Sequence, residues 1–448
     1  MSVTFMPRND KRPTLIGLYG LPGSGKSFLL DKLRGFNGDD AKDFIIFDEK
    51  QVIETVLPSA RIADFDNWAD VPRANHRKRG LEQIQTDSYE NGKGAVIAGN
   101  GKLWDGDDHY RTMISTHDFK AFTHIVYLEV PAAATHAQRL ADRKVRPLAS
   151  VNHLQKWQEA DIVYVADQCK RHSIIFTKIS AHTSIHKLFW MFHDFRRHTQ
   201  EYNAQLAEQR MERALSARPS RKLDPVLVLD GDRILAPINT RDMFMKRIHR
   251  GRGPGKENYS YEAKRQETIL CEELVPDTGY RAICEEIAKE IRIRGDFARL
   301  LHNVKVYQRH VRVLVLTCGL REVWKLVFEK AGFGDTVDII GGGRLSDGLV
   351  MTPELKERLV KYLRVQMERF VWAFGSKTQD LGMMIASNQP IVVCCKEFSN
   401  TDLATYVSQR VETHRFRPWQ VVLPGASPLS GSQIPVLSLE KLVALEFI

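Results

Sequence analysis

The sequence is poor in cysteine, and its cysteines show no metal-binding pattern. The 448 residues include six cysteines, with no CxxC pair and no histidine-rich ligand spacing around them. A structural zinc site is therefore not expected, and scattered thiols are typical of a reducing compartment. We predict a cytoplasmic protein, with the nucleus as the alternative.

Long apolar runs and an acidic excess are missing as well. No stretch approaches the roughly 18–20 apolar residues of a membrane span, so no membrane partner is expected. Lysine and arginine (65) outnumber aspartate and glutamate (55), which gives a formal charge of +10. A basic balance favours partners that carry phosphate, from nucleotides to nucleic acid, although a solvated basic surface explains it equally well.

The chain is long enough for two hydrophobic cores. Short apolar runs alternate with helical stretches over residues 13–183 and again over residues 225–448. Such alternation predicts parallel strands with helices on both faces. Residues 184–224 between them are helical by pattern and end in a stretch rich in Arg, Ser and Pro, which indicates a helical linker. We therefore predict the α/β class, with two three-layer α/β/α domains whose sheets are mostly parallel.

The first apolar run leads into a phosphate-binding motif. After TLIGLYG the chain reads LPGSGKS, which completes GxxxxGKS between a predicted strand and a predicted helix. Backbone N–H groups of such a loop surround phosphates, its lysine contacts the β and γ phosphates, and its serine hydroxyl ligates Mg²⁺. We predict ATP and Mg²⁺ as ligands of this loop, bound by Gly20, Gly23, Ser24, Gly25, Lys26 and Ser27.

Later residues of the first half are candidates for an acceptor site and a lid. Asp48 follows the second apolar run and would ligate Mg²⁺ through water or accept a proton from a substrate hydroxyl, with a helix cap as the alternative. The third run ends in AGNG, which lacks an acidic residue and leaves backbone amides for an acceptor. Arg139, Arg143 and Arg146 would share one helix face, either over the transferring phosphoryl group or in solvent. Over residues 13–180 the chain resembles the small-molecule and polynucleotide kinases that use a P-loop.

The second half opens on VLVLDGD, an apolar run that ends in Asp230 and Asp232. This stretch resembles the first motif of the haloacid-dehalogenase superfamily, and Thr317, Lys356 and Asp380 follow in that family's order. The resemblance implies that Asp230 attacks phosphorus, that Asp232 donates and accepts protons, and that Thr317 and Lys356 hold the phosphoryl oxygens. It also implies Mg²⁺ beside the nucleophile, held by Asp230 and Asp232.

The same resemblance implies a Rossmann-like second domain with a helical insertion. The helical stretch over about 240–308 resembles the cap of phosphoserine-phosphatase-type members. Two positions depart from the family's pattern, because Ile234 stands where a threonine is usual and Ser376 replaces the metal-binding aspartate of the fourth motif. A neutral hydroxyl is a poor ligand for a hard cation, and losing even ~3 kcal/mol of transition-state stabilisation would slow a reaction more than a hundredfold. We predict a retained fold with impaired phosphatase activity.

Three functions remain open from the sequence. The order of the halves resembles bifunctional polynucleotide kinase–phosphatases, and phrases such as LTCGLREVW resemble fungal fusions of an AAA-type P-loop domain with a phosphoserine-phosphatase-like domain. These imply an ATP-dependent kinase joined to a phosphohydrolase for a phosphorylated small molecule. The second function is a nucleotide-responsive regulator that binds a phosphorylated ligand without hydrolysing it. The third is nucleic-acid end repair, for which the basic stretch 241–265 with Phe244, Tyr259 and Tyr261 would contact the backbone and stack bases.

Overall fold

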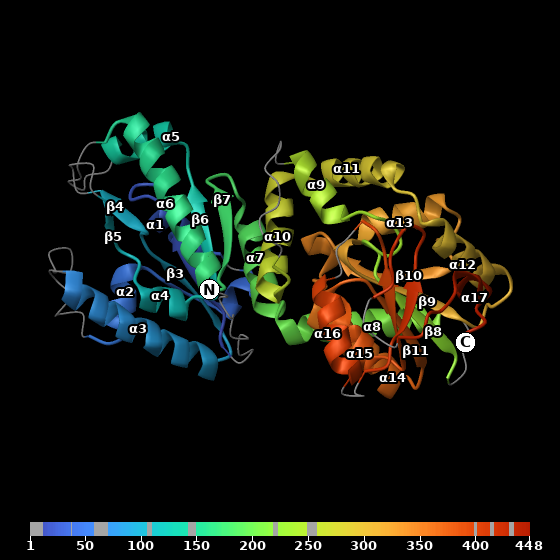
Figure 1. The fold of residues 1–448 in the computed structure, drawn as a ribbon. Helices are drawn as coiled ribbons and strands as arrows, with labels where there is room; N and C mark the ends of the chain where they lie inside the picture. Colours follow the sequence, from blue (N-terminus) through green and yellow to red (C-terminus); the bar gives the residue numbers. More distant parts are fainter. Residues whose placement is uncertain are drawn as a thin grey trace. The chain divides into compact units, whose positions relative to one another are not determined.

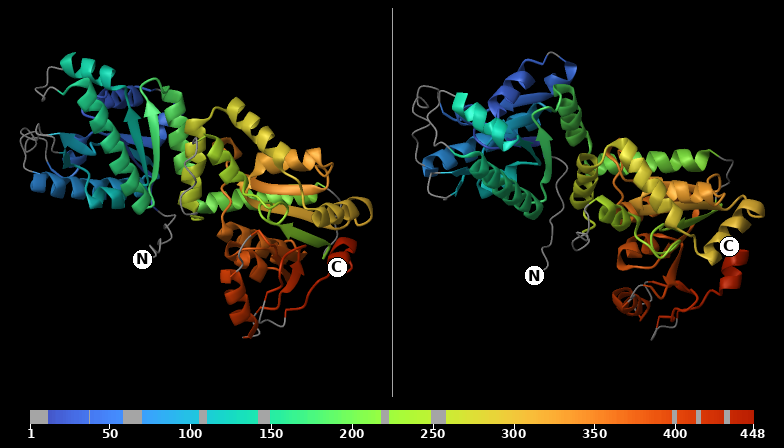
Figure 2. Two further views of the ribbon diagram at one scale, coloured as in Figure 1. Left: turned by 45° about the horizontal axis from the view of Figure 1, so that its top comes forward. Right: turned by 90° about the horizontal axis from the view of Figure 1, so that it is seen from above.

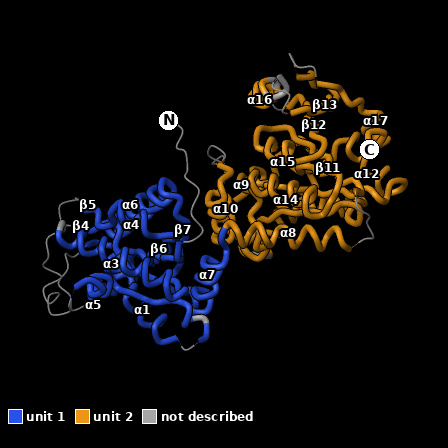
Figure 3. Tube along the Cα trace, turned by 90° about the horizontal axis from the view of Figure 1, so that it is seen from below, with its two compact units in different colours: residues 1–199 blue, residues 200–448 orange. Residues whose placement is uncertain are grey.

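The structure is a computed structural model that describes residues 12–36, 38–57, 70–104, 110–141, 149–217, 223–248, 258–397, 401–412, 416–429 and 434–448. The chain divides into two compact units, residues 1–199 and residues 200–448 (Figure 3). Each unit contains a parallel sheet with helices around it (Figures 1 and 2). The predicted α/β fold class is therefore confirmed.

Unit 1 contains a five-stranded parallel sheet in the order β2-β3-β1-β6-β7. Its strands are β1 (Leu15–Tyr19), β2 (Phe44–Phe47), β3 (Gly94–Ala98), β6 (His124–Glu129) and β7 (Ile175–Ser180). A separate antiparallel pair consists of β4 (Lys102–Trp104) and β5 (Tyr110–Thr112). Because β1 is central and all its neighbours are parallel, the loop that leaves its carboxyl end is flanked by the ends of β3 and β6.

Helices cover this sheet because side chains alternate along each strand. Leu15 and Tyr19 of β1 join a buried cluster with side chains from α2 (Glu49–Glu54), α3 (Asp70–Glu90), α4 (Thr116–Ala121) and α6 (Val151–Arg171). Phe44 points to the opposite face from Phe47, and it packs against two phenylalanines of α7 (Ile185–Arg197). The remaining helices of unit 1 are α1 (Lys26–Arg34) and α5 (Ala132–Ala141).

Unit 2 contains a six-stranded parallel sheet in the order β10-β9-β8-β11-β12-β13. Its strands are β8 (Pro225–Leu229), β9 (Arg312–Leu320), β10 (Val337–Gly342), β11 (Phe370–Gly375), β12 (Gln389–Cys394) and β13 (Trp419–Val422). Alternate residues of β8 enter different cores, with Leu227 and Leu229 in one cluster and Val226 and Val228 in the other. This alternation is what a strand buried on both faces requires.

Two sets of helices cover the two faces of the second sheet. The cluster of Leu227 receives side chains from α9 (Thr240–Ile248), α10 (Tyr261–Leu274), α11 (Asp277–Glu290), α12 (Gly295–Val306), α13 (Arg321–Lys330) and α17 (Leu439–Ala444). The cluster of Val226 receives side chains from α8 (Gln200–Ser216), α14 (Pro353–Val365), α15 (Leu381–Ala386) and α16 (Thr401–Glu412). Within the described ranges, no helix is both long and apolar enough to cross a membrane.

The predicted linker and cap are more closely integrated than the sequence indicates. The described residues of the range 184–224 form α7, which belongs to unit 1, and α8, whose Ala207 and Met211 are fully buried in unit 2. The described residues of the range 240–308 form helices α9 to α12, and Phe244 and Phe297 are fully buried in the core on the sheet. Both segments have apolar faces, and in unit 2 these faces pack against strands of the six-stranded sheet.

Candidate active sites

The first candidate site is the loop between β1 and α1. Gly20, Gly23 and Gly25 have φ values of 154°, 88° and 90°, a region that favours glycine. A Cβ atom at Gly20 would lie 2.9 Å from the carbonyl oxygen of Leu128, so a larger residue would displace backbone. The Ser24 N–H donates to the Leu21 carbonyl at 3.0 Å and closes the turn. This backbone has the tight wrap that a phosphate cradle requires.

Side chains of the loop are placed to meet an anion. Lys26 Nζ donates to the carbonyl oxygens of Gly20 (2.6 Å) and Leu21 (2.9 Å), which holds the ammonium against the loop. The Ser24 hydroxyl is buried and has no hydrogen-bond partner among the described residues. Ser27 is exposed in the first turn of α1, so its hydroxyl is accessible. The predicted nucleotide-binding residues of this loop therefore lie together.

Asp48 takes the structural role that the sequence left as an alternative. Its Oδ1 accepts from the Gln51 N–H and the Gln51 side chain accepts from the Asp48 N–H, both at 2.9 Å, which forms a capping box on α2. Its Oδ2 lies 3.7 Å from Arg34. The side chain is 42% exposed at the carboxyl end of β2, so the cap does not shield its carboxylate from a ligand.

Of the predicted lid arginines, Arg139 is the one that the structure describes. It is buried, its Nη1 donates to the Pro22 carbonyl at 3.0 Å, and its guanidinium lies 5.6 Å from the centre of the Trp157 ring. Arg139 thus supports the P-loop from α5. Arg143 and Arg146 lie outside the described residues, so the lid stays a prediction.

Sequence reasoning missed a buried acid near the P-loop. Asp161 of α6 is fully buried, and the Tyr127 hydroxyl donates to its Oδ2 at 2.9 Å. Burial raises the pKa of Asp161 to about 6, although the Tyr127 hydrogen bond and the charge of Lys26 act in the opposite direction. A Cβ atom at Gly101 would lie 2.3 Å from Oδ1 of Asp161, so this glycine of the AGNG stretch makes room for the acid. No motif marks Asp161, because in the sequence it is an ordinary polar residue of a long helix.

The second candidate site lies at the carboxyl ends of β8, β9 and β11. Asp230 is fully buried directly after β8, and Lys356 Nζ lies 3.0 Å from its Oδ2. The same Nζ lies 3.3 Å from Oδ1 of Asp380. Thr317 is fully buried on β9, where its Oγ1 accepts from the Gly319 N–H at 3.0 Å. Residues far apart in the sequence therefore meet at one edge of the sheet, as the predicted order of motifs requires.

Asp232 is buried beside Asp230 and is held by three donors. Trp324 Nε1 donates to its Oδ1 at 2.8 Å, and the N–H and hydroxyl of Thr240 donate at 3.1 Å each. Burial, and then the negative charge of Asp230, raises the pKa of Asp232 to about 6. A carboxyl group with such a pKa exchanges protons near neutral pH, which suits the predicted acid–base role.

The two positions that depart from the family pattern have different surroundings. Ile234 is fully buried in the core cluster of Leu227, so this position serves packing. Ser376 is buried, its N–H donates to Oδ2 of Asp380 at 3.1 Å, and its Oγ has no hydrogen-bond partner among the described residues. Sequence reasoning missed the next residue, Lys377, whose Nζ lies 2.9 Å from Oδ2 of Asp230.

The donors around Asp230 do not suit Mg²⁺. This ion requires several hard oxygen ligands in near-octahedral geometry, usually carboxylates and waters. One oxygen of Asp230 already faces two ammonium groups, and Asp232 is held by Trp324 and Thr240. Among the described residues, no group of three or more His, Cys, Asp and Glu could hold a metal ion. The predicted ligand pair of Asp230 and Asp232 is therefore not supported as a metal site, because lysines already neutralise the nucleophile.

Five of the described residues in the basic stretch 241–265 are buried. Phe244 has no exposed surface, and Arg241, Tyr261, Lys264 and Arg265 are buried. Interior side chains do not stack on bases or follow a phosphate backbone, so these five residues give the nucleic-acid hypothesis no support. Residues 249–257 of the stretch lie outside the described residues, and the hypothesis stays untested.

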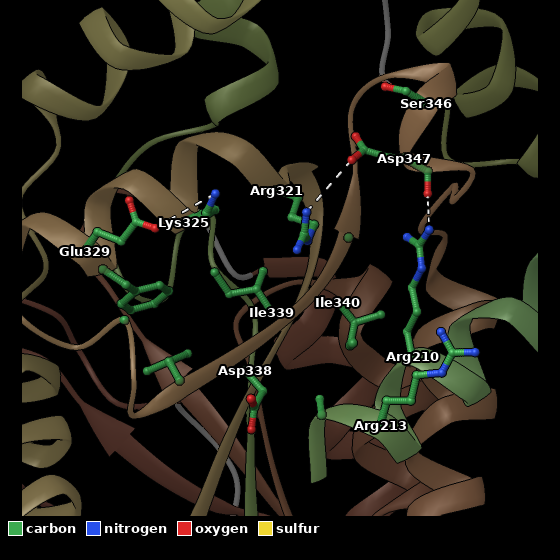
Figure 4. A pocket seen from close by; sticks show the side chains of 15 residues that line it. Arg210, Arg213, Arg321, Lys325, Glu329, Asp338, Ile339, Ile340, Ser346 and Asp347 are labelled. Carbon is green, nitrogen blue, oxygen red and sulfur yellow. Dashed lines mark hydrogen bonds and ion pairs between the residues drawn. The ribbon is translucent and has the colours of Figure 1, made fainter. Parts of the chain in front are cut away.

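A cavity of about 590 Å³ lies beside the edge strand β10 of unit 2 (Figure 4). Arginines of α8 and α13 point into it, among them Arg210, which donates to the Asp347 carbonyl, and Arg321, which lies 4.0 Å from the Asp347 carboxylate. None of the predicted catalytic residues lines this cavity. It is separate from the Asp230 site, and two of its cations, Arg321 and Lys325, already have acidic neighbours.

Comparisons with known proteins give distant likenesses. No protein-family model and no curated protein matches the sequence. A phosphoserine phosphatase in its apo form is similar at 17% identity over 39% of this chain and 88% of that chain, with a TM-score of 0.27. Shikimate kinase from Bacteroides thetaiotaomicron is similar at 12% identity over 45% of this chain and 98% of that chain, with a TM-score of 0.24.

A third similar structure covers more of the chain. A chain of the Pnkp1/Rnl/Hen1 complex is 12% identical over 83% of this chain and 92% of that chain, with a TM-score of 0.21. A kinase and a phosphatase of the kinds that the sequence resembles are thus among the structures to which this chain is similar. Identities and TM-scores this low carry no conclusion about activity.

Proposed function

We propose that the chain is a phosphoryl-transfer protein with an ATP-dependent kinase site in unit 1 and a phosphomonoester site in unit 2. The observation that carries the proposal is the P-loop, in which Gly23 and Gly25 adopt positive φ and Lys26 is held by loop carbonyls. Such a backbone surrounds phosphates, and the lysine supplies positive charge beside the phosphoryl group that is transferred.

The acceptor of the kinase would bind where β2 and β3 end beside the P-loop. Asp48 presents an exposed carboxylate there and would accept the proton of an acceptor hydroxyl. Gly99 and Asn100 follow β3 at the same edge, where the Gly99 N–H already donates to the Leu18 carbonyl at 3.0 Å. Ser27 would hold Mg²⁺, which would neutralise charge on the transferred group.

In unit 2, Asp230 would act as the nucleophile toward a phosphomonoester. Its carboxylate oxygen would form a bond to phosphorus while the bond from phosphorus to the leaving oxygen breaks, which yields an aspartyl-phosphate. Asp232 would protonate the leaving oxygen and then take a proton from the water that attacks the intermediate. Lys356 and Thr317 would hold the phosphoryl oxygens and offset their charge.

Substrate-dependent ATP consumption tests the kinase half. With a panel of small hydroxyl acceptors, Lys26→Ala should abolish turnover, because the loop then lacks its ammonium. Lys32→Ala is the matched control, since Lys32 is exposed on the same helix and should leave turnover unchanged. Equal turnover in wild type and Lys26→Ala would contradict the assignment.

A second candidate for unit 2 is a regulator that binds a phosphorylated ligand without hydrolysing it. The double ion pair of Asp230 favours this candidate, because a nucleophile that is strongly paired with cations attacks less readily. Phosphate release from a panel of phosphomonoesters separates the two candidates. Release that vanishes in Asp230→Asn identifies a hydrolase, whereas tight ligand binding with negligible release identifies a regulator.

A further inference from the structure

The carboxylate of Asp230 lies between two lysines that come from different elements. Lys356 belongs to the first turn of α14, and Lys377 follows β11. Their Nζ atoms lie 3.0 Å and 2.9 Å from the same oxygen, Oδ2. Burial acts to raise the pKa of Asp230, but the two ammonium charges outweigh it and hold that pKa below its usual range. Asp230 is therefore an anion with its counter-charges already in place.

The other acids of the site are committed to protein partners. Oδ1 of Asp380 faces Lys356, and its Oδ2 accepts from the Ser376 N–H. Asp380 is therefore not available to replace the carboxylate that Ser376 lacks. Neither the carboxylate oxygens of Asp230 nor the Oγ of Ser376 have a hydrogen-bond partner among the described residues, and of the two Asp230 oxygens it is Oδ2 that faces the lysine ammonium groups. Ser376 thus keeps a hydroxyl that can donate, and Asp230 keeps a carboxylate oxygen, Oδ1, that can attack.

Charge balance connects the serine with the lysine that follows it. In the family pattern, a carboxylate at the position of Ser376 together with a divalent ion contributes one net positive charge. Here Ser376 contributes none, and Lys377 contributes one positive charge. Replacing the carboxylate and the divalent ion by Ser376 and Lys377 keeps the net charge beside Asp230 unchanged. Replacing the carboxylate by serine alone would change it.

Lys377 is enclosed in a way that a surface lysine is not. Its side chain is 10% exposed, and its Nζ lies 5.8 Å from the centre of the Tyr259 ring. A desolvated ammonium is costly unless it is paired, so the site is shaped to keep a cation at this place. A ring face beside it adds a favourable interaction.

We infer that the Lys377 ammonium is the resident cation of the Asp230 site, and that this site receives the phosphoryl group of a phosphomonoester without a divalent metal ion. The inference rests on the proposal that unit 2 binds a phosphomonoester. Lys377 and Lys356 offset the charge of the phosphoryl oxygens, and the Ser376 hydroxyl donates to one of them. Oδ1 of Asp230 then faces phosphorus.

Calorimetric titration with inorganic phosphate tests the inference in the full chain. Lys26→Ala serves as the background, so that the P-loop does not take up the phosphate. The expected dissociation constant is the same in EDTA and in MgCl₂ to within about twofold, and Mg²⁺ alone gives no binding heat. Replacing Lys377 with Met should weaken phosphate binding at least about tenfold, the size expected for losing a hydrogen bond to a charged group. Lys361→Met, on the exposed face of α14, is the matched control and should bind as the background does.

The double substitution Ser376→Asp with Lys377→Ala provides the converse test. It should bind phosphate at least about tenfold more tightly in MgCl₂ than in EDTA, because it restores the carboxylate and removes the competing cation. The inference is overturned if the Lys26→Ala background binds phosphate only with Mg²⁺, if it binds Mg²⁺ alone at this site, or if it binds no phosphate in either buffer.

Folding and hydrolysis are kept apart from this test. Removal of one partner of a buried ion pair can unfold a domain, so Lys377→Arg is the second variant; it keeps the charge and should bind phosphate in EDTA. Phosphate binding without metal but without phosphomonoester hydrolysis would leave the inference standing and remove the hydrolase half of the proposed function. Hydrolysis that needs Mg²⁺ and vanishes in Asp230→Asn would overturn the inference and leave the hydrolase half of the proposed function standing.

Discussion

The two units both bury lysines at the carboxyl edge of a parallel sheet, but they pair them differently. Lys26 in unit 1 donates to two neutral carbonyl oxygens, and its charge also acts on the buried Asp161. Lys356 in unit 2 lies between the carboxylates of Asp230 and Asp380. In the first site backbone carbonyls thus hold the lysine, whereas the second site is a balanced cluster of side-chain charges. From this difference we expect that removing a lysine weakens ligand binding in unit 1 and lowers the free energy of unfolding in unit 2.

The largest expected effect comes from Lys356→Met. It leaves two buried carboxylates short of a counter-charge, and breaking a buried pair in this way costs about 3–5 kcal/mol. Thermal unfolding should show the transition of unit 2 at a clearly lower temperature. Lys26→Met should lower the free energy of unfolding less than Lys356→Met does, because each of its hydrogen bonds to a carbonyl contributes only about 1 kcal/mol. Similar losses in the two variants would break the comparison, and Asp230→Asn added to Lys356→Met should recover part of the stability.

Buried acids of the two units also differ, because their pKa values are shifted in opposite directions. Lysines hold the pKa of Asp230 below its usual range in spite of burial, whereas burial raises the pKa of Asp161 to about 6. The native state thus holds the Asp161 proton more tightly than the unfolded chain does. Stability falls as pH rises from the usual aspartate pKa to about 6, and the cost is complete above that pH.

Asp161→Asn should therefore gain stability relative to wild type as the pH rises. A difference of about two pH units corresponds to about 3 kcal/mol, which we expect as an upper limit between pH 4 and pH 7.5. Denaturant unfolding at both pH values measures it. Asp167→Asn is the control on the same helix, because Asp167 is exposed and should show no such dependence. If the difference in free energy of unfolding between wild type and Asp161→Asn did not change with pH, ionisation of Asp161 in the native state would cost no stability.

The sequence was sufficient for the fold class and for the grouping of the second site. Asp230, Thr317 and Asp380 follow predicted strands, and parallel strands bring such positions to one edge. Lys377 was missed because it is not part of the motif. Its role depends on its ion pair with Asp230, which the order of residues does not indicate. The spacing of Arg139 predicted a shared helix face but not its bond to Pro22.

The insertion shows the same limit. Its helical periodicity was readable, because apolar residues repeat at helical spacing. The pattern gives an apolar face but not the partner of that face, so the packing of Phe244 and Phe297 on the sheet was not predictable. Asp161 is a second example of this limit. Its burial depends on a neighbour, Gly101, that is 60 positions away in the chain.

A smaller effect on stability than that of the buried charges is expected from the P-loop backbone. Gly25 has a φ of 90°, and a Cβ atom there would meet nothing closer than Oε1 of Gln138 at 3.8 Å. Gly25→Ala therefore introduces conformational strain without a clash, at about 1–2 kcal/mol. Nucleotide affinity should fall much more than stability, because the strain is relieved by moving the N–H groups that would face the phosphates.

Gly295→Ala is the control for this glycine substitution. Gly295 begins α12, has no positive φ and has open space around its Cβ position, so alanine should be neutral or stabilise by about 0.4–1 kcal/mol. ATP binding by calorimetry and thermal unfolding, measured on both variants, separate the two effects. If Gly25→Ala bound ATP as wild type does, the cradle would depend on side chains after all, and the two sites would be built on the same principle.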